Sequence, residues 1–400
     1  MRLTYLRSPI ASGFFALLLS SLVLLLGAAP HALAMSSHSS DGHVYVLNND
    51  VQGSNSITVF NREEDGSLSV SGVTSIGGLG SVLAFSDGTQ GSLIQTPDRT
   101  RLFAVDAGSD QISVINVRNG QLSLAGVFPS GGSGPVSLTY QQGLLYVLNA
   151  ANADPSAAAN VAGFHVDADG TLHPIAGATQ ALSTAHPNPA QVLIDPRGRF
   201  LLVTEKLTNL IDVYRIHGDG SLSAPTIYPS VGVFPFGMAF NPATSQENVL
   251  VDDGVGGPNN TGGVTSYHLA NGTPKAINGP VYDNQIAPCW MVITRNGRFA
   301  YTSDADSHTI SGYSIDEDGS ISLLNADGVT GSTPSDTFPI EEGLSRDSQY
   351  LYVLDSRLLL PVPGLATVSG FSINHDGSLT SVVDPSQITL PFSAIGLAAD

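Results

Sequence analysis

One short motif recurs seven times along the chain and constrains its fold more than any other feature. It is an Asp-Gly or Asn-Gly pair followed by a run of β-forming residues. Such pairs supply the positive φ angles that a tight hairpin turn needs. A repeat of about 50 residues built from strand-forming residues is typical of a β-propeller and not of a helical solenoid. The glycines of the seven motifs, spaced 47 to 58 residues apart, are Gly66, Gly120, Gly170, Gly220, Gly272, Gly319 and Gly377.

Each repeat contains four strand candidates, which we name A to D in chain order. Strand B is the strongest, as in Val44–Leu47, and strand C alternates polar and apolar residues with period two. The chain begins with a B strand and ends with an unpaired A strand at 394–398. We therefore predict an all-β, seven-bladed β-propeller with four antiparallel strands per blade. Residues 35–400 form its single domain, and the C-terminal strand closes the ring on Val44–Leu47.

The first 34 residues have the pattern of a signal peptide. Arg2 and Arg7 precede an apolar stretch at 13–29, and Ala32-Leu33-Ala34 suits signal peptidase. Cleavage after Ala34 would export the protein to the periplasm or the extracellular space. An uncleaved N-terminal anchor is the alternative. No other segment is apolar for long enough to cross a bilayer, so we expect no membrane association after cleavage.

Charge and cysteine content narrow the classes of partner. The leader holds two of the 15 basic residues and none of the 34 acidic ones, which leaves the mature chain near −21. Such a charge repels nucleic acids and anionic membranes. Cys289 is the only cysteine, so no intrachain disulfide can form and stability must come from a large core. Because Cys289 lies in an apolar run at 287–293, we expect a buried, inert thiol and not a nucleophile.

The order of the strands predicts where a site lies. The A–B and C–D turns share one face of the ring, here called the turn face, and the B–C and D–A loops share the other, the loop face. The loop face carries the irregular insertions, around a central channel, and function usually lies on such loops. The turn face carries most arginines, which we expect to be unnecessary for function: Arg99, Arg101, Arg197, Arg199, Arg295, Arg298 and Arg346.

Each B strand ends on the loop face with an acidic or amide residue. Asp and Asn cap turns by bonding to nearby backbone N–H groups, and a repeated turn would repeat the residue. The same carboxylates could alternatively hold a divalent cation, and Asp252-Asp253 and Asp304-Ala305-Asp306 are the densest groups. No metal cluster or cofactor motif is present. The seven residues are Asn48, Asp106, Asn149, Glu205, Asp252, Asp304 and Asp355.

The starts of the A strands are less regular and so more informative. The aligned residues are Ser92, Ser137, Gln191, Gly237, Trp290, Glu341 and Ser393. Gln191, Trp290 and Glu341 depart from the small or apolar residues that core packing alone would favour. Trp290 could stack on a sugar-like ring or fill the channel. Glu341, with Glu342 beside it, could be a general base or one half of an ion pair.

Three passages resemble a known family: 189–206, 235–240 and 287–298. They are similar to the bacterial lactonase family of seven-bladed propellers, which includes 6-phosphogluconolactonase and the fungal carboxymuconate-lactonizing enzymes. The resemblance runs from about His43 to the end and suggests an exported branch. His186 lies near the position of a family histidine, whereas Glu205-Lys206 replaces the usual sequence after the next B strand. The family's anion-holding arginines have no evident match, which argues against phosphorylated or polycarboxylate substrates.

Two functional hypotheses follow. The first is a lactone hydrolase, a carboxylic ester hydrolase, that opens a neutral or weakly charged sugar-type lactone without a cofactor. Glu341 or Glu205 would activate water, and His186 or Lys206 would polarise the carbonyl group. Gln191, Trp290 and Arg357 would bind the small-molecule substrate. The second is a non-catalytic propeller that binds a protein, a glycan or a small ligand outside the cytoplasm.

Overall fold

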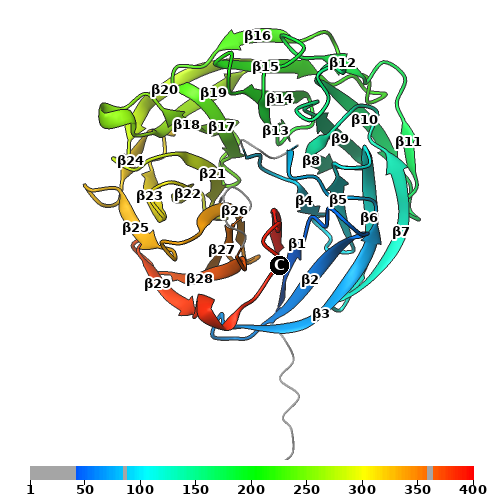
Figure 1. Cartoon of the computed structure of the whole chain (residues 1–400). Coiled ribbons are helices and arrows are strands. Elements are labelled where there is room, and N and C mark those ends of the chain that lie inside the picture. The colour runs from blue at the N-terminus through cyan, green and yellow to red at the C-terminus, as the bar shows by residue number, and fades with distance from the viewer. Residues whose placement is uncertain (1–41, 84–87, 358–363) are drawn as a thin grey trace, which may run out of the picture. The chain divides into compact units, whose positions relative to one another are not determined.

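A computed structural model describes residues 42–83, 88–357 and 364–400 of the chain. Strands in these ranges form seven antiparallel sheets, the blades, arranged around a common centre (Figure 1). This confirms the predicted all-β, seven-bladed propeller. Two short 3₁₀ turns, η2 (Pro258–Asn260) and η3 (Pro385–Gln387), interrupt the loops. The predicted signal peptide and its alternative, an N-terminal anchor, lie outside the described residues. None of the helices in the described part is long and apolar enough to span a membrane.

The two inner strands of each blade match the predicted A and B strands. The A strands are β4 (Leu93–Gln95), β8 (Pro135–Gln141), β13 (Pro189–Ile194), β17 (Val233–Phe240), β21 (Pro288–Ile293), β26 (Phe338–Leu344) and β30 (Gly396–Ala399). The B strands are β1 (Gly42–Leu47), β5 (Arg101–Asp106), β9 (Leu144–Asn149), β14 (Phe200–Glu205), β18 (Asn248–Val255), β22 (Phe299–Asp304) and β27 (Tyr350–Ser356). The B strands are almost entirely buried, as expected for apolar strands packed on both faces.

The outer strands complete each sheet. The C strands are β2 (Asn55–Arg62), β6 (Gln111–Arg118), β10 (Asn160–Val166), β15 (Leu210–Arg215), β19 (Gly263–Ala270), β23 (Thr309–Ile315) and β28 (Thr367–Ile373). The D strands are β3 (Leu68–Gly77), β7 (Gln121–Pro129), β11 (Leu172–Pro174) with β12 (Gln180–Ala181), β16 (Thr226–Pro229), β20 (Thr273–Tyr282), β24 (Ile321–Leu323) with β25 (Val329–Ser332), and β29 (Leu379–Val383). In two blades the D strand is split, and both pieces pair with the same C strand.

The ring closes through its two ends, as predicted. β30 pairs antiparallel with β1, placing Leu397 opposite Val46 and Ala399 opposite Val44. The closing strand covers 396–399 and not the expected 394–398, because a turn in which Ala394 N donates to Pro391 O precedes it. Around the centre, each A strand contacts the next, from β4 through β8, β13, β17, β21 and β26 to β30 and back to β4.

The repeated turn explains the seven glycines. All of them have φ between +71° and +96°, which residues with a side chain rarely adopt. Several are fixed from the preceding blade by a buried B-strand tyrosine whose hydroxyl donates to the glycine carbonyl. Tyr352 contacts Gly66 O in this way, and Tyr146 contacts Gly220 O, each at 2.8 Å. The turn motif therefore joins neighbouring blades as well as strands C and D.

Cys289 is buried and forms no disulfide, as expected. It lies at the start of β21, between Pro288 and Trp290. Burial raises the pKa of its thiol well above the usual value, and the negative charge of Asp252 adds to this effect. Because the thiolate is the reactive form, this environment disfavours nucleophilic chemistry at Cys289.

Candidate active site at the centre of the loop face

The A strands reach the loop face through irregular backbone. The ladder slips by a residue or more near the start of β8, β13, β17, β21 and within β26. Three residues there, Phe234, Ala287 and Glu341, have positive φ angles of 62°, 59° and 48°. Such angles are costly for residues other than Gly, Asn and Asp, and they often occur at functional sites. Three of the positive φ angles of the described residues therefore lie where the sequence places the candidate site.

A short stretch of the D–A loop between β3 and β4 lies at this centre. We call residues Gly88–Gly91 the central segment. It binds A strands of several blades: Gln90 N donates to Ala190 O at 3.2 Å, and Leu138 N donates to Gly91 O at 2.8 Å. Its side chains are also used, since Thr89 Oγ1 donates to Val136 O at 3.3 Å. The central segment therefore ties β8 and β13 together at the loop face.

Three of the residues predicted to form the site converge on this central segment. Lys206 Nζ donates to Gly88 O at 2.7 Å, and Trp290 Nε1 donates to Thr89 O at 2.7 Å. Both carboxylate oxygens of Glu341 accept from Gly91 N, at 3.1 and 3.2 Å. The three side chains come from three different blades: Lys206 follows β14, Trp290 lies in β21 and Glu341 lies in β26.

Glu341 is buried, and burial raises the pKa of its carboxyl well above the ordinary value. Its hydrogen bonds from Gly91 and Ser92 oppose this shift, and the charge of the neighbouring Glu342 adds to it. A carboxyl group with a raised pKa can exchange a proton near neutral pH, which is what a general acid or base requires. The ion pair that we considered as the alternative for Glu341 is not formed among the described residues.

Lys206 and Trp290 share an aromatic neighbour. The Lys206 ammonium lies 4.8 Å from the centre of the Phe236 ring, within the range of a cation–π contact. The Trp290 ring packs on Phe236 with centroids 5.1 Å apart. Trp290 is almost fully buried, so it fills the centre of the ring and presents little surface for stacking on a sugar. Lys206 is equally buried, and its amino group reaches the central segment.

The other predicted site residues do not join this group. Gln191 Oε1 accepts from Met238 N and so joins β13 to β17. Glu205 is buried and accepts from Ser183 N at 2.9 Å, from the Ser183 hydroxyl and from Thr208 Oγ1 at 2.6 Å. These three donors already occupy its carboxylate oxygens, and none of them belongs to the central segment.

His186 and Arg357 lie on the loop face outside the central group. The His186 side chain is exposed. The loop that carries His186 lies beside β14, where Lys206 N donates to Asn188 O at 3.2 Å. Arg357 forms an ion pair with Asp336, on the loop that precedes β26. Among the described residues, no hydrogen bond or ion pair joins His186 or Arg357 to the central segment.

Most acidic and amide residues at the B-strand ends have a structural role, but with other partners than expected. They accept mainly from side chains of the adjacent C strand and not from backbone N–H groups. Asp106 accepts from Ser113 Oγ at 2.7 Å, Asp304 from Ser311 Oγ at 2.8 Å, and Asp355 from Ser369 Oγ at 2.6 Å. The alternating polar residues of strand C supply these hydroxyls, a pairing visible in the sequence only once the register is known.

Sequence reasoning did not place three residues at the centre of the ring. Gln90 belongs to the central segment, and nothing in the loop sequence marks it. Asp252 was named as a B-strand end and, with Asp253, as a candidate cation ligand, and it is the fully buried carboxylate at a B-strand end that has no hydrogen-bond partner among the described residues. Glu342 accepts from Ser303 Oγ at 2.7 Å, and burial raises its pKa to about 8. Its position next to Glu341 was the one available signal.

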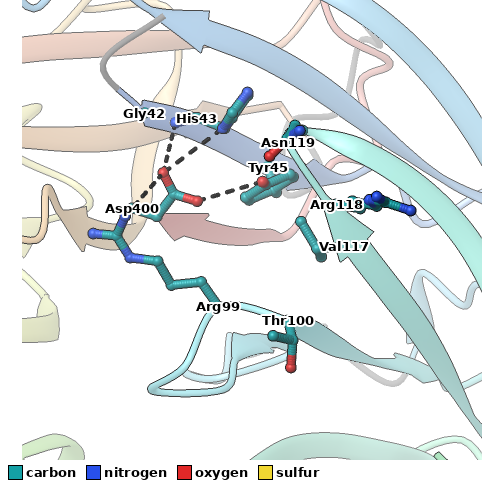
Figure 2. A pocket seen from close by; sticks show the side chains of 10 residues that line it. Gly42, His43, Tyr45, Arg99, Thr100, Val117, Arg118, Asn119 and Asp400 are labelled. Atoms are coloured by element: carbon teal, nitrogen blue, oxygen red, sulfur yellow. Dashed lines mark hydrogen bonds and ion pairs between the residues drawn. The ribbon is translucent and has the colours of Figure 1, made fainter. Parts of the chain in front are cut away.

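A cavity of about 450 Å³ lies on the turn face, beside the ring closure (Figure 2). Arg99 from an A–B turn and Arg118 from the end of β6 line it, together with His43, Tyr45 and Asp400. Asp400 faces the basic groups: it accepts from His43 N at 2.8 Å and lies 4.0 Å from Arg99 Nη1. Burial raises the pKa of Asp400, but its hydrogen bonds from His43 and Gln95 outweigh this and lower the pKa below the ordinary value. The protein's own carboxylate thus already contacts His43 and Arg99 in this cavity.

Comparisons with known proteins agree with the fold. The family described as lactonase, 7-bladed β-propeller matches residues 91–251. This confirms the resemblance seen in the sequence and covers less than half of the chain. No curated protein sequence matches significantly.

Solved structures extend the likeness over the whole ring. The Pseudomonas aeruginosa periplasmic gluconolactonase has a TM-score of 0.66 at 18% identity, over 89% of this chain and 99% of that one. A proposed 6-phosphogluconolactonase from Bacteroides uniformis has a TM-score of 0.64 at 16% identity, over 90% and 100%. A hypothetical selenium-binding protein from Sulfolobus tokodaii reaches 0.67 at 11% identity, over 90% and 94%. At these identities the likeness shows a common fold.

Proposed function

Because the chain resembles the seven-bladed lactonase propellers over residues 91–251, we propose that it is a lactonase-like hydrolase that opens a sugar-type lactone. One structural observation carries the proposal: Lys206, Trp290 and Glu341 come from three blades and meet at the centre of the loop face. The shared fold alone would not support an activity, since one fold serves many functions.

The proposed chemistry follows from the hydrogen bonds that Lys206 and Trp290 make to the central segment. Lys206 and Trp290 each donate to a backbone carbonyl oxygen of the central segment, at 2.7 Å. A lactone carbonyl that takes the place of these segment oxygens would be held in the same way, and the Lys206 ammonium would stabilise the negative charge that develops on its oxygen. Glu341 would take a proton from the attacking water and return it to the ring oxygen as the carbon–oxygen bond breaks. The product is the open-chain hydroxy acid.

The charge of the protein favours a neutral substrate. The mature chain is near −21, and among the interactions of the described residues Lys206 is the basic side chain that contacts the central segment. The turn-face arginines are on the opposite side of the ring, and Asp400 faces Arg99 in the cavity there. A phosphorylated lactone would therefore find little positive charge at the proposed site. We further propose export, because the first 34 residues have the signal-peptide pattern described above.

The direct test is a pH-stat screen of the purified chain without residues 1–34 against neutral and phosphorylated sugar lactones. We expect base uptake above the spontaneous rate with a neutral lactone, and a weaker response with its phosphorylated counterpart. A heat-inactivated sample controls for spontaneous opening. If no lactone is opened faster than in that control, the proposed activity is wrong.

One observation favours the second hypothesis, a non-catalytic binding propeller. Several large aliphatic side chains are exposed on loops of the loop face: Leu79, Leu207, Val231, Ile286 and Leu365. Exposed apolar groups clustered on one face often mark interaction surfaces. Replacing Leu207 and Val231 with Ser should leave lactone turnover intact if the protein is an enzyme. If the protein is instead a binding module, the same change should weaken capture of a protein or glycan partner. Neither the wild type nor the variant should then turn over a lactone.

A further inference from the structure

Gly237 lies within β17, and other elements closely bound the space that a side chain would take there. Of the seven aligned A-strand residues, it is the one without a side chain. Oxygen atoms from three separate elements face this space. Gln90 Oε1, Asp252 Oδ2 and the main-chain oxygen of Cys289 lie 2.3, 2.8 and 3.0 Å from the point where a Cβ on residue 237 would be. They belong to the central segment, to β18 and to β21.

The orientation of the Gln90 amide is fixed by its partners. Gln90 Nε2 donates to Met291 O at 2.8 Å, and Met291 N donates to Gln90 Oε1 at 3.2 Å. The side-chain amide pairs with β21 as a peptide group would. The reversed amide would place its NH₂ group against the Met291 N–H, so the oxygen must be the atom that faces Gly237.

Asp252 is the group that most needs a partner. Its side chain is 0% exposed, and neither carboxylate oxygen has a hydrogen-bond partner among the described residues. The matching carboxylates Asp304 and Asp355 accept from hydroxyls of their own blades. Glu342 Oε2 is likewise buried and unpartnered, and Glu342 is the strongest neighbouring charge on Asp252. Buried acceptors facing one another without a donor are unfavourable unless something positive lies between them.

We propose that the space facing Gly237 binds a hard cation, Ca²⁺ foremost, through Asp252, the Gln90 amide oxygen and the Cys289 main-chain oxygen. Carboxylate, amide and main-chain oxygens are the ligands that Ca²⁺ takes, in flexible geometry and at 2.3–2.6 Å. Mg²⁺ fits less well because it demands a stricter octahedron and keeps its waters. Asp252 and Glu342 together would balance the two positive charges.

This site has a mixed ligand set. Among the described residues, no group of three or more His, Cys, Asp and Glu side chains could hold a metal. Two of the three ligands proposed here are neutral oxygens, which such a grouping does not include. The inference is independent of the proposed hydrolysis, because a cation here would join the central segment to β18 and β21 whether or not the protein is an enzyme. The simplest competitor is a proton on Asp252 together with one on Glu342, because burial raises the pKa of both carboxyl groups.

The experiment measures cation binding on the mature chain after EDTA treatment and buffer exchange. Thermal unfolding is followed while Ca²⁺, Mg²⁺ or Na⁺ is added, and bound metal is counted by elemental analysis. We expect a saturable rise of the unfolding midpoint with Ca²⁺, at one ion per chain, and a smaller rise with Mg²⁺. No rise with any of the three cations and no bound metal would overturn the proposal.

Matched variants locate the site. Asp252→Asn removes the charged ligand and Gly237→Ala fills the space, so both should lose the Ca²⁺ response. Asp355→Asn changes an equally buried B-strand carboxylate in another blade and should keep it. A Ca²⁺ response retained in Asp252→Asn would refute the assignment. So would an Asp252→Asn protein that matches the wild type in midpoint and metal content, because that result fits a proton in place of a cation.

A readout on the wild type avoids any variant that fails to fold. Trp290, the sole tryptophan of the sequence, follows Cys289 directly. Tb³⁺ takes the same oxygen ligands as Ca²⁺, and its luminescence would be sensitised by excitation of Trp290. We expect emission on adding Tb³⁺ that Ca²⁺ suppresses. Absence of sensitised emission, or emission that Ca²⁺ does not suppress, counts against the site.

Discussion

Replacing Glu341 with Gln separates a catalytic carboxyl group from a structural one. Gln keeps the size of the side chain, and its oxygen can still accept from Gly91 N. The new NH₂ group cannot accept from Gly91 and Ser92 as the carboxylate oxygen does, which costs about 1–3 kcal/mol of stability at every pH. If Glu341 is the proton-transfer group, turnover should fall by about 10²–10⁴-fold.

The pH dependence of stability gives a second, independent signature. Burial raises the folded-state pKa of Glu341 well above 4.5, so the unfolded chain releases the proton first as pH rises. Below about pH 4.5 Glu341 is protonated in both states and the wild type keeps its full free energy of unfolding. As the pH rises from there to the folded-state pKa, the free energy of unfolding falls by up to about 1.4 kcal/mol per pH unit. The variant lacks this loss, so its stability relative to the wild type should improve from pH 5 to pH 8.

The assay is denaturant unfolding of both proteins at pH 5, 6.5 and 8, with lactone turnover measured on the same samples. A difference in the free energy of unfolding between wild type and variant that changes with pH, combined with lost turnover, supports the catalytic assignment. Unchanged turnover in the variant would refute the proposed role of Glu341. Parallel stability profiles would show that the fold does not raise its pKa.

Four further outcomes are expected. Arg197→Gln with Arg298→Gln, on the turn face, should leave turnover within about twofold, and a hundredfold loss with the fold intact would move the site to that face. Tyr352→Phe strands the buried Gly66 carbonyl and should lower stability by about 1–3 kcal/mol in denaturant unfolding. Burial and Glu205 raise the pKa of Asp212 to about 8, so Asp212→Asn should gain stability relative to the wild type from pH 5 to pH 8, and a flat difference would argue against the shift. Deleting residues 1–34 should keep the protein in the cytoplasm on fractionation, whereas export of the shortened chain would refute the leader assignment.

The fold was predictable because the propeller repeats its local chemistry. Each Asn-Gly or Asp-Gly turn needs a glycine at positive φ, so the turn is visible in every blade without knowledge of the others. The alternation in strand C and the apolar strand B fix the strand order. Ring closure followed from the unpaired strand at one end, and the turn at Pro391 shifted only its bounds.

The site was less predictable because it is assembled by a loop. The sequence marked Glu341, Trp290 and Lys206 as unusual, and the structure brings all three to the central segment. Nothing in the sequence indicates that Gly88–Gly91 reaches the centre of the ring, since loop conformation depends on partners in distant blades. For the same reason the sequence could not show that Glu205 is held by three donors or that Asp252 has none.

The central claim is that lactone opening takes place at the centre of the loop face, and Lys206→Met tests it most directly. Methionine keeps much of the side chain that lies over Phe236 and removes the ammonium group that contacts Gly88 O. The measurement is the pH-stat rate on the best neutral lactone for the wild type, for Lys206→Met and for the turn-face double variant, each checked for folding. The account predicts that the wild type and the turn-face variant open the lactone at rates within about twofold of each other, and that Lys206→Met loses about 10²-fold or more. A Lys206→Met protein that is folded and as fast as the wild type, or a wild type that opens no lactone, would contradict it.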